Sequence, residues 1–439
     1  MRIGAWRPPA WLLPLAAGLT IGVLLVATVP AALRWWRGTP ADLVIVSGVE
    51  DGEGGARQAL IDLWNQLHPD KRARIELVAG SADEQHGAMV RFAKAEEEVK
   101  ADILNLDVTA VAEFAEFGHI AEWPAGEAPA RVLGELLEKP RASCYYRGKL
   151  WGLPFNSDAG VLFARRSLLV PVPATTPTAF SWEKVAEQGP ASGSSPLAAA
   201  YAGQLDGYEG LTVNAMEALW ALEPREARAG EAGPLGVPVD PAVWSAAVDR
   251  LYGRPGDRVI DPASTTYRES GTSDQFLRKK IAFMRNWPVA YRTLVETSDQ
   301  TASVAAADIV MTPLPGPAVL GGQNLAVVSG SARGDDAREL IEFLAGEPSQ
   351  RLLMQVGGFA AATGATYDRP EIQAAHPYAA TIRAAIENSR QRLQTPYYPR
   401  FSEELRTIVT EIRAKGGKEV PANLEKRLLD ASKGRLPPR

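Results

Sequence analysis

The stretch from Phe283 to Tyr291 (FMRNWPVAY) combines a short apolar run with one guanidinium, one amide and one indole before a proline ends it. Arginine is enriched where planar hydrogen-bonding groups are held, and tryptophan where a flat, half-wet face must be covered. The pattern predicts a strand end that offers a small polar ligand hydrogen bonds from Arg285 and a stacking surface on Trp287. An alternative interpretation is a buried strand whose tryptophan fills the core and whose arginine is salt-bridged.

Length and composition limit the classes of protein that this chain can belong to. A chain of 439 residues exceeds what one hydrophobic core usually organises, so we expect two lobes. A net charge of −5 with scattered Lys and Arg residues gives no footprint for nucleic acid. Cys144 is the single cysteine, which excludes an internal disulfide, and we expect it to be a small core residue. The histidines lack metal-ligand spacing, so we expect no metal and no cofactor, although a site assembled from distant segments stays open.

The N-terminus carries a targeting signal. After a basic segment, residues 1–10, an uncharged and mostly apolar run extends over residues 11–33, which as a helix is about 34 Å long and spans a bilayer core of ~30 Å. Arg34, Trp35, Trp36 and Arg37 follow it, as is typical of a membrane anchor. Val29 to Ala31 also fits a signal-peptidase site, so a cleaved signal is the competing interpretation. We favour a single-pass cell-membrane anchor with residues 1–10 in the cytoplasm and the large C-terminal region outside it.

Strand and helix patterns alternate after the anchor. Buried strands are predicted at residues 43–46, 74–78 and 103–106, and helices at 56–67 and 83–99. This alternation indicates an α/β fold with a mainly parallel sheet.

Polar residues follow these strands at positions suited to a ligand. Asp107 stands at the carboxyl end of a strand, where open α/β sheets bind ligands. Glu50 and Asp51 lie in a glycine-rich loop that lacks a phosphate-binding motif, and their charge suits hydroxyl donors or a helix N-terminus. Tyr208 and Glu209 precede a predicted helix, where they fit either a sugar contact or a helix-entry contact.

Five blocks occur in order along the chain: FNSDAGVLF, YEGLTVNAMEALW, FMRNWPVAY, PLPGPAVLGGQNLAV and TPYYPRFSEEL. In order and spacing they resemble the extracellular solute-binding proteins of ABC transporters, specifically the trehalose/maltose-type sugar-binding group, from about Leu43 to the C-terminus. The resemblance implies a two-lobed periplasmic-binding-protein fold (type II-like), here preceded by one N-terminal transmembrane helix, in which the chain crosses a hinge twice and again near its end. It divides the chain into lobe 1, residues 41–155 and 318–348, and lobe 2, residues 156–317 and 349–439.

The resemblance also implies a ligand site in the cleft between the lobes. Its residues would be Glu50, Asp51, Asp107, Asp158, Tyr208, Glu209, Arg285, Trp287, Gly322, Asn324 and Tyr397. Carboxylates, amide and guanidinium would exchange hydrogen bonds with sugar hydroxyls, and the aromatic rings would cover the apolar sugar faces. The implied partners are a carbohydrate, ABC permease subunits and the membrane, and we expect a monomer.

The sequence departs from the sugar-binding pattern at three points. Ala110 and Gln323 stand where relatives commonly have aromatic rings, and no lipid-bearing cysteine precedes Cys144. A spanning segment can replace the lipid as an anchor. The loss of two rings removes apolar contact from a stacking site.

Three functions follow from these features. The first is extracytoplasmic binding of a di- or oligosaccharide and its delivery to an ABC permease. The second is a membrane-anchored sensor or interaction module with a degenerate sugar site. The third, which we rank last, is a glycoside-cleaving enzyme using Asp107, Asp158 and Glu209 as acid and base. We expect that the protein is not an enzyme, because no catalytic sequence signature accompanies these carboxylates.

Overall fold

The computed structural model describes residues 42–49, 55–171, 175, 178–189, 197–223, 234–254, 256–296 and 304–435. The predicted anchor at residues 11–33 lies outside these ranges, as do Glu50 and Asp51. Within the described ranges, no helix combines the length and the apolar character needed to cross a bilayer.

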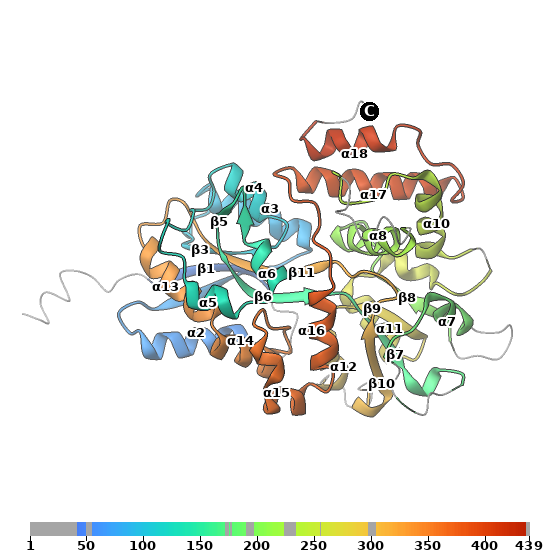
Figure 1. Cartoon of the computed structure of the whole chain (residues 1–439), viewed down its shortest axis with the longest axis horizontal. Helices are drawn as coiled ribbons and strands as arrows, with labels where there is room; N and C mark the ends of the chain where they lie inside the picture. Colours follow the sequence, from blue (N-terminus) through green and yellow to red (C-terminus); the bar gives the residue numbers. More distant parts are fainter. Residues whose placement is uncertain are drawn as a thin grey trace, which may run out of the picture.

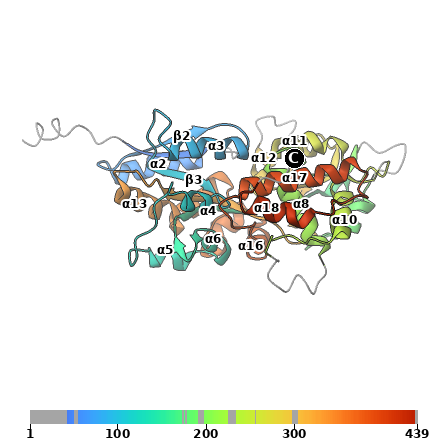
Figure 2. The same ribbon diagram turned by 90° about the horizontal axis from the view of Figure 1, so that it is seen from above.

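The chain forms two α/β lobes, each built around one sheet and lying side by side (Figures 1 and 2). Lobe 1 contains a five-stranded sheet of order β2-β1-β3-β11-β6, in which β2, β1 and β3 are parallel and β11 and β6 run antiparallel to their neighbours. The parallel part confirms the arrangement predicted for the N-terminal strands. The strands are β1 (Leu43–Gly48), β2 (Ala73–Val78), β3 (Ile103–Asp107), β6 (Leu153–Ala159) and β11 (Leu320–Val327).

Helices cover both faces of this sheet, which explains why β1 is buried along its whole length. Leu43 and Ile45 face one cluster with α2 and α13, whereas Val44 and Val46 face another with α3 and α4. Cys144 lies in the first cluster with no exposed surface, as predicted. The elements are α2 (Ala56–Leu67), α3 (Ala82–Ala93), α4 (Val111–Glu116), α5 (Ala130–Glu135), α6 (Glu138–Ser143), the hairpin β4 (Tyr145–Tyr146) and β5 (Lys149–Leu150), α13 (Gly334–Ala345) and α14 (Glu347–Leu352).

Lobe 2 contains a four-stranded sheet of order β10-β7-β9-β8. Its strands are β7 (Val161–Arg165), β8 (Ala199–Ala202), β9 (Ile281–Asn286) and β10 (Ile309–Pro313). A separate helical core made by α8, α10, α17 and α18 packs beside this sheet (Figure 1, right). The helices are α7 (Trp182–Glu187), α8 (Glu209–Leu222), α10 (Pro241–Tyr252), α11 (Glu269–Leu277), α12 (Ala290–Glu296), α15 (Pro370–Ala375), α16 (Ala379–Glu387), α17 (Tyr398–Ala414) and α18 (Leu424–Ser432).

Two short segments join the sheets directly. Gly160 links β6 to β7, and residues 314–319 lead from β10 back to β11. The predicted lobe boundary between residues 155 and 156 falls inside β6, because β6 pairs with β11 as far as Ala159. Residues 349–357, which the prediction assigns to lobe 2, pack against α2 of lobe 1.

Gly322 supplies the clearest test of this architecture. Its φ is +108°, and a Cβ atom there would stand 2.5 Å from the backbone oxygen of Asn156 on the neighbouring strand. Gly322→Ala should therefore lower the free energy of unfolding by about 2 to 3 kcal/mol, measured by urea denaturation. Gly330→Ala is the control, since no heavy atom lies within 4 Å of its added methyl group, and should change stability by less than about 0.5 kcal/mol. Equal effects of the two substitutions would contradict the close pairing of β6 and β11.

Candidate functional site

A cavity of about 1190 Å³ lies between the two lobes. Lobe 1 contributes the ends of β1 and β3 and the start of α3, and lobe 2 contributes the starts of α8 and α11 together with one face of α17. The carboxyl ends of the parallel strands thus open into it, which is the edge where α/β sheets bind ligands.

The cavity collects most of the predicted site residues that the structure describes. Those that line it are Asp107, Asp158, Tyr208, Glu209, Trp287 and Gly322. Three predicted site residues do not line the cavity: Arg285, Asn324 and Tyr397. The local structure around each one explains why.

Asn324 and Tyr397 point away from the cavity. Asn324 has no exposed surface and donates from Nδ2 to Ser143 Oγ at 3.0 Å, because successive side chains on a strand face opposite sides and Gln323 takes the cavity side. Tyr397 packs edge-on against the ring of Phe117, with centroids 6.0 Å apart. Its neighbour Tyr398 lines the cavity and donates its hydroxyl to Glu209.

The two interpretations of residues 283–291 each hold for one residue. Arg285 is a buried, salt-bridged core residue, whereas Trp287 lies at the cavity. Arg285 is only 1% exposed and donates to both carboxylate oxygens of Glu217, at 2.9 and 3.0 Å. Trp287 lines the cavity, and the Arg285 guanidinium carbon lies 3.8 Å from its ring centroid on the protein side. Arg285 is therefore a buried, salt-bridged strand residue that supports the indole from behind.

Arg392 connects the lobes at the cavity and was not predicted. Its Nη1 donates to Glu209 Oε1 of lobe 2 at 2.7 Å, and its Nη2 donates to Asp107 Oδ1 of lobe 1 at 3.0 Å. Burial opposes its charge, but Asp107, Tyr398 and Glu209 together raise the pKa of Arg392. The guanidinium is thus held ionised between the two lobes. No periodic pattern marks it, because its partners lie far away in the sequence.

A second buried cation, Arg57, occupies the floor of the cavity in lobe 1. Its Nη1 donates to Ser47 Oγ at 3.0 Å and its Nη2 to Gln323 Oε1 at 3.3 Å. The guanidinium carbon also lies 4.9 Å from the ring centroid of Phe359, which lines the same cavity. Gln323, at a position where an aromatic ring was expected, therefore makes this floor polar.

Several side chains on the cavity wall retain a buried polar atom without a hydrogen-bond partner in the described part of the chain. They are Asn105 through Oδ1, Asn156 through Oδ1 and Arg392 through Nε. Buried polar groups are nearly always paired, and an unpaired one costs about 1 to 3 kcal/mol. Two acceptors and one donor beside the cavity are thus unpaired among the described residues.

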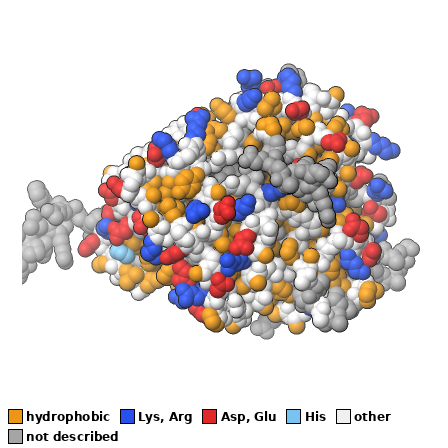
Figure 3. All heavy atoms as spheres, in the orientation of Figure 1, with side chains coloured by type: hydrophobic (Ala, Val, Ile, Leu, Met, Phe, Trp, Pro, Cys, Tyr) orange, Lys and Arg blue, Asp and Glu red, His pale blue; other side chains and the backbone are white. Residues whose placement is uncertain are grey.

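Charged side chains of both signs also meet at the rim. Arg406 on α17 donates to Asp83 Oδ2 on α3 at 3.1 Å, joining lobe 2 to lobe 1 at the surface. Elsewhere on the face in Figure 3, acidic and basic side chains are interspersed, as the scattered charges in the sequence predict. Among the residues that the structure places, no group of three or more potential ligands could hold a metal ion.

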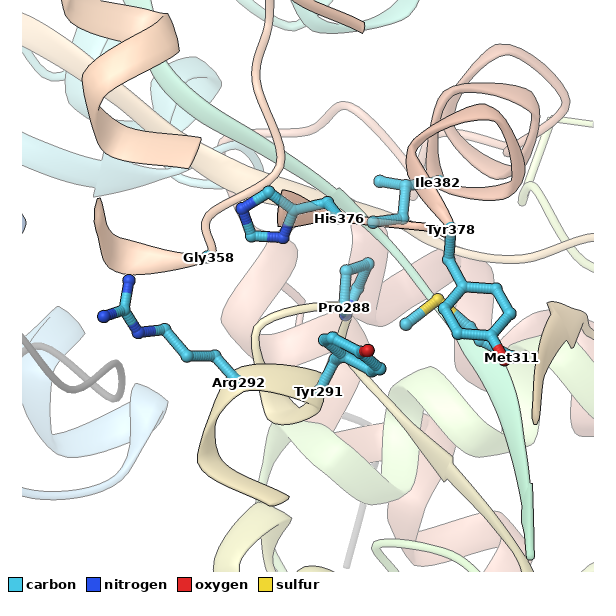
Figure 4. Close-up of a pocket in the computed structure, with 8 residues that line it drawn as sticks. All are labelled: Pro288, Tyr291, Arg292, Met311, Gly358, His376, Tyr378 and Ile382. Atoms are coloured by element: carbon cyan, nitrogen blue, oxygen red, sulfur yellow. The ribbon is translucent and has the colours of Figure 1, made fainter. Parts of the chain in front are cut away.

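Figure 4 shows a second, much smaller cavity. Pro288 and Gly358 line it, whereas their chain neighbours Trp287 and Phe359 line the large cavity. His376 also lines it, is 8% exposed, and keeps Nε2 without a partner in the described residues.

Comparison of the sequence with known proteins gives a consistent result. The profile of the family described as "Bacterial extracellular solute-binding protein" matches residues 48–351. A "Probable ABC transporter-binding protein" of Deinococcus radiodurans is 27% identical over 290 residues, which cover 63% of this chain and 67% of that protein.

Solved structures give the same fold. Maltose-bound T. maritima MalE3 superposes with a TM-score of 0.73 at 23% identity, covering 90% of this chain and 98% of that one. An ABC transporter solute-binding protein from Thermotoga lettingae, bound with α-D-tagatose, gives a TM-score of 0.69 at 17% identity, covering 89% and 99%. The predicted two-lobed binding-protein architecture is thereby confirmed.

His376 provides a test of the small cavity. Burial lowers its pKa, and the charge of Arg292 acts in the same direction. The unfolded chain therefore takes up a proton near pH 6.5 that the folded protein resists, and stability is lost as the pH falls through about 6.5 towards the lower folded pKa. His376→Gln should make the free energy of unfolding less dependent on pH in this range, by at most about 1.4 kcal/mol per pH unit.

His86 is the control, because its contribution has the opposite sign. Burial opposes its protonation, but Glu113, whose Oε2 lies 2.7 Å from His86 Nε2, raises the pKa of His86 overall. Its contribution is present below about pH 6.5 and is lost as the pH rises through the folded pKa. Urea unfolding of both Gln variants at several pH values should give slope changes of opposite sign, and changes of the same sign would contradict these environments.

Proposed function

We propose that this chain, which belongs to the bacterial extracellular solute-binding protein family, binds a di- or oligosaccharide between its lobes and delivers it to an ABC permease. The family match confirms the resemblance that the five sequence blocks predict. Members of this family are substrate-binding proteins of ABC transporters and not enzymes, so the glycoside-cleaving function is set aside.

The observation that carries the proposal is the set of polar atoms at the cavity wall that have no hydrogen-bond partner among the described residues. Asn105 and Asn156 keep acceptors, and Arg392 keeps a donor. A hydroxyl group both donates and accepts, whereas a carboxylate ligand only accepts and an ammonium ligand only donates. A neutral polyhydroxylated ligand is therefore the best complement, once small side-chain rotations bring these atoms to the surface of the cavity.

The size and the aromatic surfaces of the cavity support a ligand of more than one sugar ring. Its volume of about 1190 Å³ exceeds the ~300–1,000 Å³ of ordinary small-molecule pockets. Trp287 supplies an indole on the lobe 2 side, and the largely buried Tyr208 and Tyr398 contribute ring edges. The sugars named for the similar solved structures, maltose and α-D-tagatose, agree with a carbohydrate ligand.

A sensor or interaction module with a weakened sugar site is the second candidate. Ala110 lines the cavity with a methyl group, and Gln323 binds Arg57 where a ring was expected. Both candidates would use the same fold, so ligand binding distinguishes them.

Thermal unfolding of residues 41–439 with a panel of mono-, di- and oligosaccharides tests the first candidate. A ligand at 100 times its dissociation constant should stabilise the protein by ~2.7 kcal/mol and raise the midpoint by several degrees. Trp287→Ala should abolish this shift, because it removes the ring that Arg285 holds against the cavity. Trp182→Ala, on α7 and away from the cavity wall, is the matched control and should keep the shift. No shift with any sugar would favour the sensor, and an unchanged shift in Trp287→Ala would place the ligand elsewhere.

We further propose that residues 11–33 anchor the protein to the cell membrane with the lobes outside the cytoplasm. An uncleaved anchor predicts that the full-length chain partitions with membranes and that mass spectrometry finds an N-terminus upstream of residue 11. Release of the mature protein with a new N-terminus near residue 32 would support a cleaved signal.

A further inference from the structure

The buried ion pair between Glu217 and Arg285 occupies an unusual position. Glu217 on α8 is 8% exposed and Arg285 on β9 is 1% exposed, and the two form a bidentate pair in lobe 2. A buried ion pair is weak evidence for stability, since well-packed apolar residues of similar volume often replace it without loss. Its contacts therefore indicate another role.

The pair contacts both short segments that join the sheets of the two lobes. Glu217 Oε1, which accepts from Arg285 Nη2, also accepts from the backbone N–H of Val319, at 3.0 Å, immediately before β11. On the other crossing, a Cβ atom at Gly160 would stand 2.4 Å from Glu217 Oε1 and 2.7 Å from Arg285 Nη2. Only a glycine leaves room for the pair to lie directly against this crossing.

The same pair holds Trp287. The guanidinium of Arg285 stacks 3.8 Å from the indole centroid, and the far edge of the indole packs on Gly321, where a Cβ atom would come within 3.0 Å of the ring. Gly321 lies two residues after Val319 on the second crossing. The indole is thus fixed between the ion pair and the strand that returns to lobe 1.

We propose that Glu217 and Arg285 form a joint that couples ligand stacking on Trp287 to movement of the lobes about Gly160 and Val319. A rotation about these crossings moves the Val319 N–H, which donates a hydrogen bond to Glu217. Because Glu217 also binds Arg285, the guanidinium beside the indole moves with it. Conversely, a ligand that displaces the indole of Trp287 also displaces the Arg285 guanidinium. Through Glu217, this displacement reaches Gly160 and Val319 on the two crossings. Glu217 and Arg285 are positioning residues in this arrangement, because neither lines the cavity. The coupling rests on the proposed sugar-binding function.

The double variant Glu217→Met/Arg285→Met tests the joint, because it removes both charges together and leaves no unpaired buried ion. We expect sugar affinity, measured by isothermal titration calorimetry, to fall at least tenfold. In the ligand-free protein, hydrogen exchange at the Val319 amide should accelerate at least tenfold, because the acceptor of that amide is gone. A merely structural pair would not alter affinity while the fold is retained.

The control is Arg165→Met/Asp308→Asn, which neutralises another ion pair of lobe 2, between the buried Arg165 and the partly buried Asp308, with Nε and Oδ2 3.0 Å apart. This pair lies at the far ends of β7 and β10 from the crossings, so affinity and Val319 exchange should stay within threefold of wild type. Gly160→Ala provides a second probe that keeps both charges. Its methyl group displaces the pair, and we expect a several-fold loss of affinity with accelerated exchange at Val319.

The outcomes separate the joint from the proposed function. Sugar affinity and Val319 exchange within threefold of wild type in a folded double variant would overturn the joint. If the double variant does not fold, the same result in Gly160→Ala overturns it. If wild-type protein binds no sugar, the proposed function fails and the coupling to a sugar fails with it, whereas the link between the pair and the crossing is still decided by Val319 exchange.

Discussion

The arrangement of the two lobes around the cavity depends on the guanidinium of Arg392. It lies between Asp107 at the end of β3 and Glu209 at the start of α8, so one buried cation neutralises a carboxylate from each lobe. Without it, Glu209 and the partly exposed Asp107 would lose the cation that they share, and the two carboxylates would repel each other. The pairing therefore allows the carboxylates of both lobes to line one cavity while leaving lone pairs for a ligand.

The polar floor and the aromatic wall of the cavity belong to different lobes. In lobe 1, Arg57, Gln323 and the largely buried Asn105 and Asn156 line the cavity, whereas lobe 2 contributes the indole of Trp287 and the edges of the largely buried Tyr208 and Tyr398. Stacking tolerates sliding along a ring, whereas hydrogen bonds to fixed amides do not. Under the proposed function, the indole in lobe 2 would contact a sugar face and the polar groups in lobe 1 would distinguish hydroxyl patterns.

Much of the fold could be predicted from sequence because its signals are local. The helix at residues 56–67 and the strands from residues 43 and 103 follow from the apolar pattern within each segment. The site was harder, because it depends on orientation and on distant partners. Asn324 and Tyr397 each stand one residue away from a cavity residue, and the strand period or helix start that decides between neighbours cannot be read with single-residue accuracy. Arg392 and Arg57 carry no motif, since Arg392 meets Asp107 across 285 positions and Arg57 meets Gln323 across 266.

Two pairs of adjacent residues take part in lining both the large cavity and the small one. Trp287 and Phe359 line the large cavity. Their chain neighbours Pro288 and Gly358 line the small one (Figure 4). A ligand that displaces residues 287 and 359 therefore also displaces the residues that line the small cavity, and so changes its volume. Because pressure favours the state with less internal void, the balance between ligand-free and ligand-bound conformations carries a volume term as well as a chemical one.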